Sequence, residues 1–80
     1  MPPRKVCRSQ QQRNRLGAEI RARRVKMGLS QEQLGEKAEC ERNYIGRLEK
    51  GQHDIGFDVF VRIATALNTT IGELGIAAKF

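Results

Sequence analysis

The fold of this chain is decided by residues 30–51, which read SQEQLGEKAECERNYIGRLEKG. Ser30 and Gln33 have the spacing of a capping box, in which the serine hydroxyl and the glutamine side chain each bond a free backbone N–H at a helix start. Leu29 and Leu34 occupy the two positions of a hydrophobic staple around the same start. The pattern therefore predicts a short helix that begins directly after Ser30.

A second short helix is predicted after a three-residue turn. The helix after Ser30 carries Leu34 and Ala38, four residues apart, on its inward side and ends near Ala38. Residues 39–41 then form the turn, and the next helix extends over about residues 42–50, where Gly51 closes it. Two short helices joined in this way cross at a steep angle, so the second can project from the body of the domain.

The second helix of this pair has one apolar and one polar face. Ile45 and Leu48 form the apolar stripe, and Cys40 in the turn is placed to pack on Ile45. Small and polar residues fall together on the other side: Asn43, Gly46, Arg47 and Lys50. The major groove of B-DNA, about 12 Å wide, admits a helix of this kind with its side chains. A mid-helix glycine costs about 1 kcal/mol relative to alanine; close approach to a groove explains this choice, and so does simple tolerance.

Upstream, a helix is predicted from about Asn14, after a basic arm. An apolar stripe with one arginine defines this helix: Leu16, Ile20, Arg24 and Met27. Gly28 offers a left-handed stop at its end. Residues 1–13 are polar and basic without an apolar period, so we expect them to form a flexible N-terminal arm. A longer first helix that starts near Ser9 is the alternative, because glutamine and arginine tolerate helix well.

Downstream, two further helices complete the domain. The fourth has apolar residues at i, i+3, i+4 and i+7: Phe60, Ile63, Ala64 and Leu67. Asn68 is a left-handed stop, and Thr70 with Glu73 forms a second capping box that opens a short fifth helix. The inward positions of that helix are Ile71 and Leu74. The sequence thus predicts an all-α fold of five helices, with residues 14–80 as a single domain.

The distribution of charge points to a polyanionic partner. Residues 1–28 carry nine Lys or Arg and one Glu, a balance of +8, whereas residues 29–80 carry six Lys or Arg and eight Asp or Glu, a balance of −2. A basic third of this kind is an electrostatic footprint for nucleic acid, although a solvated tail has the same composition. The few aromatic residues do not interleave with the basic cluster, which argues against base stacking on single strands.

Composition argues against several other classes of protein. Eighty residues allow one modest core, and no Ser/His/Asp or paired-carboxylate arrangement indicates an enzyme. Two distant cysteines and one histidine lack zinc-site spacing, so neither a metal nor another cofactor is expected. No apolar run approaches the roughly 20 residues of a membrane helix, and the start lacks the apolar segment of a secretory signal. The sparse cysteines fit a reducing compartment, so we expect a cytoplasmic, nucleoid-associated protein.

The cysteines and the histidine have simple interpretations. Cys40 occupies an apolar turn position and fits a small hydrophobic residue, with a redox-sensing role as the alternative. Cys7 lies in the arm and is expected to be exposed. His53, in a loop without a catalytic partner, is expected at the surface.

The motifs together resemble a known family. The motif GLSQEQL at residues 28–34, followed by YI and LEKG within residues 44–51, is similar to the Cro/cI-type (XRE) helix-turn-helix family. The resemblance continues through residues 57–67 and covers about residues 14–75. Within the family, residues 42–46 (RNYIG) resemble the controller proteins of restriction–modification systems. The resemblance implies a lambda-repressor-like DNA-binding domain that regulates transcription by sequence-specific binding to double-stranded DNA in the major groove.

The resemblance also implies roles for individual residues. Base-reading places are occupied by Arg42, Asn43 and Arg47. Arginine can bond O6 and N7 of guanine, and asparagine can bond N6 and N7 of adenine. Places that contact backbone phosphates are occupied by Gln31, Tyr44, Lys50, Gln52 and the backbone near Gly56. For Tyr44 the alternative is a half-buried ring that packs on the helix directly after Ser30.

Two features implied by the resemblance lie outside the recognition helix. Arg24 and Glu49 correspond to an ion pair that ties the first helix to the third, although a freed Arg24 would also reach a phosphate. The basic residues at the N-terminus would add phosphate or minor-groove contacts and a steep salt dependence: Arg4, Lys5, Arg8, Arg13 and Arg15.

The chain departs from the family pattern at two turn positions. Glu39 stands where the family usually has glycine, so it must adopt a left-handed conformation at a cost of about 1–2 kcal/mol, or the turn is rebuilt. Glu41 replaces the usual Ser or Thr cap, which weakens the cap and brings negative charge close to DNA.

A homodimer on a palindromic operator is expected, because one recognition helix contacts too few base pairs to find a site in a genome. The predicted interface consists of Ile71, Leu74, Ile76 and Phe80. In the simpler alternative, Ile71 and Leu74 close the monomer core and Phe80 does not pack against the domain. The dimer would cover a promoter and block RNA polymerase, or sit beside polymerase and touch it.

Two other functions remain open from the sequence. The chain would act as an antitoxin-type DNA-binding protein if its main role were to bind a protein partner. It would bind structured RNA or a membrane surface if the basic third acted without sequence preference.

Overall fold

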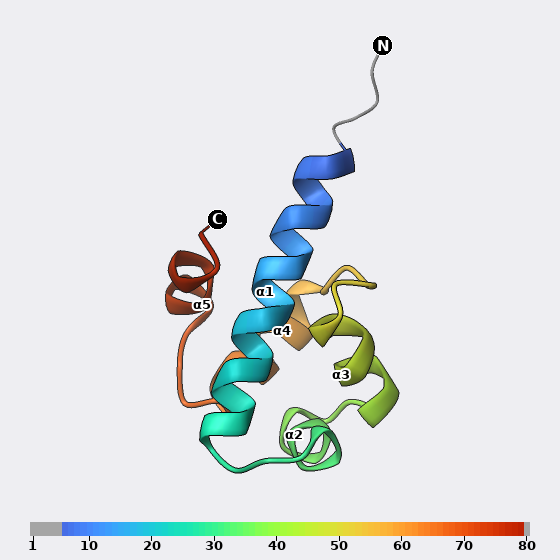
Figure 1. The fold of residues 1–80 in the computed structure, drawn as a ribbon. Coiled ribbons are helices and arrows are strands. Elements are labelled where there is room, and N and C mark those ends of the chain that lie inside the picture. The colour runs from blue at the N-terminus through green and yellow to red at the C-terminus, as the bar shows by residue number, and fades with distance from the viewer. Residues whose placement is uncertain (1–5, 80) are drawn as a thin grey trace.

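The computed structural model describes the backbone of residues 6–79 and the side chains of residues 10–79, and in this part all regular structure is helical. The elements are α1 (Val6–Lys26), α2 (Gln31–Ala38), α3 (Arg42–Glu49), α4 (Phe57–Ala66) and α5 (Ile71–Ala77). Figure 1 shows the long α1 with α3 and α5 on opposite sides of it and α2 near its C-terminal end. The predicted all-α, five-helix fold is confirmed.

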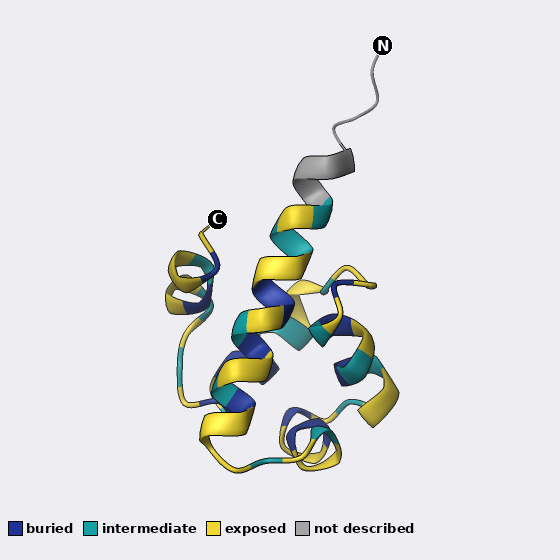
Figure 2. Ribbon diagram, in the orientation of Figure 1, coloured by how far each residue is buried: buried dark blue, intermediate teal, exposed yellow. Residues whose placement is uncertain are grey.

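The core takes one large, fully buried side chain from each helix. These five residues are Ile20, Leu34, Ile45, Ile63 and Leu74. Figure 2 shows the buried faces of the helices turned toward one another, with the exposed faces outside. The apolar stripes predicted for α2, α3 and α4 all lie in or against this core. Met27 is an exception, since it is 37% exposed and follows the last residue of α1.

Local signals set the helix ends as the sequence predicts. The Ser30 hydroxyl accepts a hydrogen bond from the Gln33 N–H at 3.0 Å, and the Gln33 side chain accepts one from the Ser30 N–H at 2.8 Å. Gly28 and Asn68 adopt left-handed conformations after α1 and α4. The box at α5 differs from the prediction, because the Glu73 carboxylate accepts from the Thr69 hydroxyl at 2.6 Å. Only the Thr70 half of that box forms.

The turn between α2 and α3 is held by backbone geometry. Glu39 adopts the left-handed conformation expected of it, with φ 58°, at a cost of about 1–2 kcal/mol. Gly35 lies against the turn, where a Cβ atom would stand 2.5 Å from the Cys40 carbonyl oxygen. Glu41 makes no side-chain cap at the start of α3, as its identity predicts. The turn therefore keeps its three-residue length despite two unfavourable residues.

Cys40 behaves as a small apolar residue of this turn. Its side chain is half-buried against the core. Burial raises the pKa of the Cys40 thiol, and the Arg62 guanidinium opposes that shift only in part. The thiolate, which is the reactive form, is therefore disfavoured.

The first helix begins earlier than Asn14, so the prediction of a flexible arm is wrong for residues 6–13. The Gln10 amide donates to the Gly51 carbonyl oxygen and to the Asn14 side chain, both at 2.9 Å. Arg13 forms an ion pair with Asp54 at 3.0 Å. Glutamine and arginine are good helix formers, and these contacts fasten the added turns to the loop after α3. The remaining arm residues 1–5, with Arg4 and Lys5, lie outside the described residues, as does the Arg8 side chain.

Candidate nucleic-acid interface

The outer face of α3 carries four exposed polar side chains, which we call the reading face: Arg42, Asn43, Arg47 and Lys50. They surround a shallow hollow of about 290 Å³, which Gln31 of α2 and Gly46 complete. No part of the described chain covers this face. The three residues predicted to read bases thus share one open surface with two of the predicted phosphate contacts.

Buried contacts on the opposite side hold α3 in this position. Ile45 and Leu48 are buried in the core. Behind them α1 lies very close to α3, because Gly17 has no side chain. A Cβ atom there would stand 2.3 Å from the Leu48 carbonyl oxygen and 2.7 Å from that of Glu49. The sequence reading missed this role, although Gly17 lies three residues before Ile20 on the buried stripe of α1.

The predicted ion pair between Arg24 and Glu49 is present and nearly buried. Arg24 Nε donates to Glu49 Oε2 at 2.6 Å and Arg24 Nη2 donates to Oε1 at 3.1 Å. The same guanidinium donates to the Leu29 carbonyl oxygen at 2.8 Å. One arginine therefore joins α1, the start of α2 and the end of α3, which makes the pair a brace of the helix-turn-helix geometry.

Gln31 links this brace to the reading face. Its Nε2 donates to Glu49 Oε1 at 3.0 Å. The amide lies over Gly46, where a Cβ atom would stand 3.5 Å from Gln31 Oε1. That distance is an ordinary contact, so an alanine would fit, but a larger side chain would meet the amide. Nε2 has a second N–H, which the brace does not use.

Tyr44 makes a structural contact on the side of α3 next to the following loop. Its ring is half-buried and meets the exposed His53 edge to face at a centroid distance of 5.2 Å. The hydroxyl donates to the Asp54 carbonyl oxygen at 3.3 Å. The single hydroxyl donor of Tyr44 is therefore engaged within the chain, and the ring packs against the core and the loop after α3.

The remaining phosphate candidates lie at the ends of α3 and α4. Gln52 is exposed and follows α3, while its backbone N–H bonds the Arg47 carbonyl oxygen at 2.9 Å. Gly56 is the exposed N-cap residue of α4, and no side chain caps that end. The first N–H groups of a helix need partners from outside it, so this end can accept an anion.

The other two predicted arm contacts are tied to the domain itself. Arg13 pairs with Asp54 and with Gln10. Arg15 Nε donates to the Ala78 carbonyl oxygen at 2.9 Å, which fastens the end of α5 to α1. Both side chains therefore have structural contacts that the sequence did not indicate, because their partners lie 41 and 63 residues away.

The predicted dimer patch divides into buried and exposed residues. Leu74 is fully buried in the core, so its assignment to the interface is wrong. It closes the monomer core because it faces the junction of α5 with the other helices. Ile71 is half-buried against the same core, whereas Ile76 is 81% exposed. Phe80 lies outside the described residues.

Two structural features are absent from the described residues. No group of three or more His, Cys, Asp or Glu side chains is placed to hold a metal ion. None of the described helices combines the length and apolarity that a bilayer span requires.

Comparisons with known proteins agree with this geometry. The model of a helix-turn-helix family matches residues 20–74. The chain is 36% identical over 59 residues to the control protein C.SmaI from Serratia marcescens, a match that covers 74% of this chain and 70% of that protein.

Two solved structures are similar in fold and in sequence. The clp gene regulator ClgR from Corynebacterium glutamicum is 25% identical with a TM-score of 0.81, covering 85% of this chain and 87% of that one. The restriction-modification controller protein C.AhdI from Aeromonas hydrophila is 34% identical with a TM-score of 0.75, covering 78% of this chain and 94% of that one.

Proposed function

Because the chain belongs to the helix-turn-helix family, as a DNA-binding transcription regulator of the XRE type, we propose that it binds a palindromic operator as a homodimer. Its relatives are DNA-binding regulators, which are not a class of enzymes. The observation that carries the proposal is the reading face, which is polar, basic and not covered by any described residue, while the opposite side of α3 is buried in the core. Binding places α3 in the major groove of the operator.

Base pairs are read by three side chains of the reading face. Arg42 stands in the first turn of α3, and Arg47 lies further along the same exposed face. Each can bond a guanine through O6 and N7, while Asn43 can bond an adenine through N6 and N7. Good pairs of this kind discriminate against a wrong base by about 1–3 kcal/mol each. These residues therefore supply the specificity.

Backbone phosphates are held around this centre. Gln31 offers its second amide N–H beside the reading face, and Lys50 and Gln52 are exposed at the end of α3. The free N–H groups after Gly56 offer a site for one more phosphate. The Tyr44 hydroxyl already donates its hydrogen to the Asp54 carbonyl oxygen. Tyr44 can therefore bond a phosphate only if that hydrogen bond breaks, or through a water molecule that donates to its hydroxyl oxygen. Contacts of this kind fix the orientation of α3 rather than the sequence it reads.

The dimer forms through the outer face of α5, with Ile76 at its centre. Ile76 is the most exposed large apolar residue of the described chain, and an isologous two-fold contact would bury it against its own copy. Ile71, which is half-buried against the core, is proposed to contribute its exposed part to the same interface. The dimer presents two copies of α3 about one DNA turn apart.

Replacing Ile76 by lysine is expected to dissociate the dimer and leave the fold intact. The side chain makes little contact with its own core, and a buried charge at a two-fold contact meets its own like charge. Sedimentation equilibrium measures the change, with Val25→Lys on α1 as a control at another exposed apolar residue. An unchanged dimer, or equal dissociation in the control, would remove Ile76 from the interface.

Deleting residues 1–5 is expected to lower the salt dependence of DNA binding. The deletion removes Arg4 and Lys5 and leaves α1 whole. If both cations neutralise phosphates, the slope of log K against log salt falls by about two. Fluorescence anisotropy over a salt series measures that slope, and an unchanged slope would place these residues outside the interface.

In vitro selection of duplex DNA with the purified chain tests the proposed function as a whole. We expect an enriched palindrome whose half-sites are centred about one helical turn apart. Enrichment of one unrepeated half-site would contradict the dimer, and no enrichment over random duplex would contradict sequence-specific binding.

A further inference from the structure

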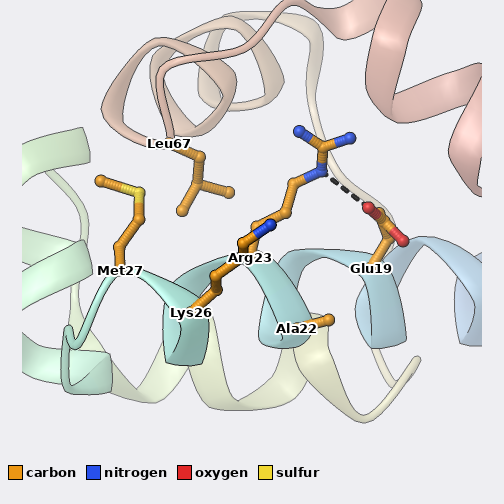
Figure 3. Close-up of a pocket in the computed structure, with 6 residues that line it drawn as sticks. All are labelled: Glu19, Ala22, Arg23, Lys26, Met27 and Leu67. Carbon is orange, nitrogen blue, oxygen red and sulfur yellow. Dashed lines mark hydrogen bonds and ion pairs between the residues drawn. The ribbon is translucent and has the colours of Figure 1, made fainter.

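A second open hollow lies on α1, away from α3. It has a volume of about 310 Å³ and is lined by Glu19, Ala22, Arg23, Lys26, Met27 and Leu67, and we call it the α1 hollow. Figure 3 shows these side chains around the C-terminal half of α1, beneath the segment that carries Leu67. Nothing in the proposed DNA-binding surface uses any of them.

The α1 hollow faces away from the surface that reads DNA. Arg24 points from α1 to Glu49 at the end of α3. Ala22 and Lys26 are each two residues from Arg24, which places them about 200° around the helix. A partner seated in the hollow would therefore not compete with a duplex on the reading face.

Two cations border the hollow, and one of them is already oriented. Arg23 Nε donates to Glu19 Oε2 at 2.7 Å, one helical turn away. Figure 3 shows Arg23 reaching Glu19 through Nε, and the two terminal nitrogens of Arg23 make no hydrogen bond within the described chain. Lys26 is exposed and forms no ion pair with a described residue. A guanidinium fixed in this way offers its terminal nitrogens to a second carboxylate.

Apolar side chains lie between and beside these cations. Ala22 and Met27 are exposed, whereas Leu67, the residue after α4, is buried in the core and only borders the hollow. Methionine adapts its shape to different apolar partners. The hollow therefore combines an adaptable apolar surface with two cations, which suits a ligand that has both carboxylates and an apolar side chain.

The openness of the hollow favours a protein segment over a small molecule. Pockets for small ligands bury most of the ligand surface, whereas this one is a shallow depression on one side of a helix. An amphipathic helix that crosses α1 would place a carboxylate on Arg23, another near Lys26, and a leucine or phenylalanine against Met27.

We propose that the α1 hollow docks an acidic amphipathic segment of a partner protein through Arg23, Lys26 and Met27. The contact leaves the reading face free, so the chain would hold DNA and this partner at the same time. The proposal depends on the described side chains alone and stands whether or not α3 reads a palindrome.

Nuclear magnetic resonance on the full ¹⁵N-labelled chain tests the proposal with two synthetic peptides. The first is a helical peptide with glutamates and leucines along one face, and the second has glutamine in place of each glutamate. We expect the acidic peptide to shift the amide signals of Ala22, Lys26 and Met27 and the Arg23 Nε–H signal until saturation. The neutral peptide is expected to bind at least about tenfold more weakly, since it loses the charge-assisted bonds.

Matched variants assign the contact to its residues. The double variant Arg23→Gln, Lys26→Gln is expected to bind the acidic peptide about tenfold more weakly. Its circular dichroism spectrum and its affinity for DNA are expected to stay unchanged. The control Arg21→Gln, Lys37→Gln removes the same charge from exposed residues outside the hollow and is expected to keep the affinity.

Four results would overturn the proposal. The first is the absence of saturable shifts at the hollow, and the second is shifts confined to the basic side of α3. The third is equal weakening in the control variant. The fourth is concentration-dependent shifts at the hollow without peptide, which would assign it to a second copy of this chain.

Discussion

Replacing Glu49 by alanine is expected to lower the free energy of unfolding by about 3 kcal/mol or more. The Glu49 side chain is only 3% exposed and that of Arg24 11%, so the substitution leaves a guanidinium nearly buried without its counterion. It also removes the acceptor of the Gln31 amide. The Leu29 carbonyl oxygen remains as a partner of Arg24, but a neutral acceptor does not compensate for the lost charge.

Urea unfolding followed by circular dichroism measures this effect. The control is Glu19→Ala, which removes an i,i+4 partner from the partly exposed pair with Arg23 and is expected to cost about 0.5 kcal/mol or less. The comparison separates a buried brace from a surface pair on the same helix. An equal decrease in the free energy of unfolding of the two variants would show that the buried Arg24–Glu49 pair stabilises the fold no more than the Glu19–Arg23 pair does.

Replacing Gly17 by alanine is expected to destabilise the fold by about 2–3 kcal/mol. The added methyl group would stand 2.3 Å from the Leu48 carbonyl oxygen and 2.7 Å from that of Glu49, and both are backbone atoms that no side-chain rotation can remove. Helix propensity acts in the opposite direction, since alanine gains about 1 kcal/mol over glycine in a helix. The sign of the measured change therefore decides whether the close contact outweighs propensity.

Gly72→Ala provides the matched control, because it places the same methyl group in a helix with free space. The nearest atom there is the Thr70 hydroxyl oxygen at 3.8 Å. Thermal unfolding should show a lower melting temperature for Gly17→Ala and an equal or higher one for Gly72→Ala. A stabilised Gly17→Ala variant would contradict the close packing of α1 on α3.

Local features of the fold could be predicted from the sequence because their causes are local. The Ser30 capping box depends on residues three apart, and the left-handed stops at Gly28 and Asn68 depend on one residue each. The two faces of α3 follow from helical period alone, so Ile45 was correctly placed in the core and Arg47 on the surface.

The misplaced features depend on contacts between distant residues. The turns of α1 before Asn14 are stabilised by Gly51 and Asp54, which no period in residues 1–13 reveals. Leu74 was assigned to an interface because apolar residues alone do not say which face the monomer itself covers. The resemblance to a family implied the partner of Arg24, and composition alone would not have found it.

In the candidate site, too, the features set within one helix could be predicted and those set by packing between helices could not. Arg42, Asn43 and Arg47 lie on one open face as expected, because their relation is set within one helix. The position of Gln31 over Gly46 depends on the packing of α2 against α3 and on the Glu49 acceptor. A sequence pattern marks such a residue but does not orient it.

If the exposed face of α3 reads base pairs, the loss of one reading side chain must remove the preference for one base pair. Anisotropy titrations compare the unchanged chain and Arg47→Ala on the selected duplex and on each of its single base-pair variants. We expect Arg47→Ala to bind the selected duplex about ten- to a hundredfold more weakly and to become indifferent to the base pair at one position of each half-site. Unchanged affinity, or a uniform loss that keeps discrimination at every position, would contradict it.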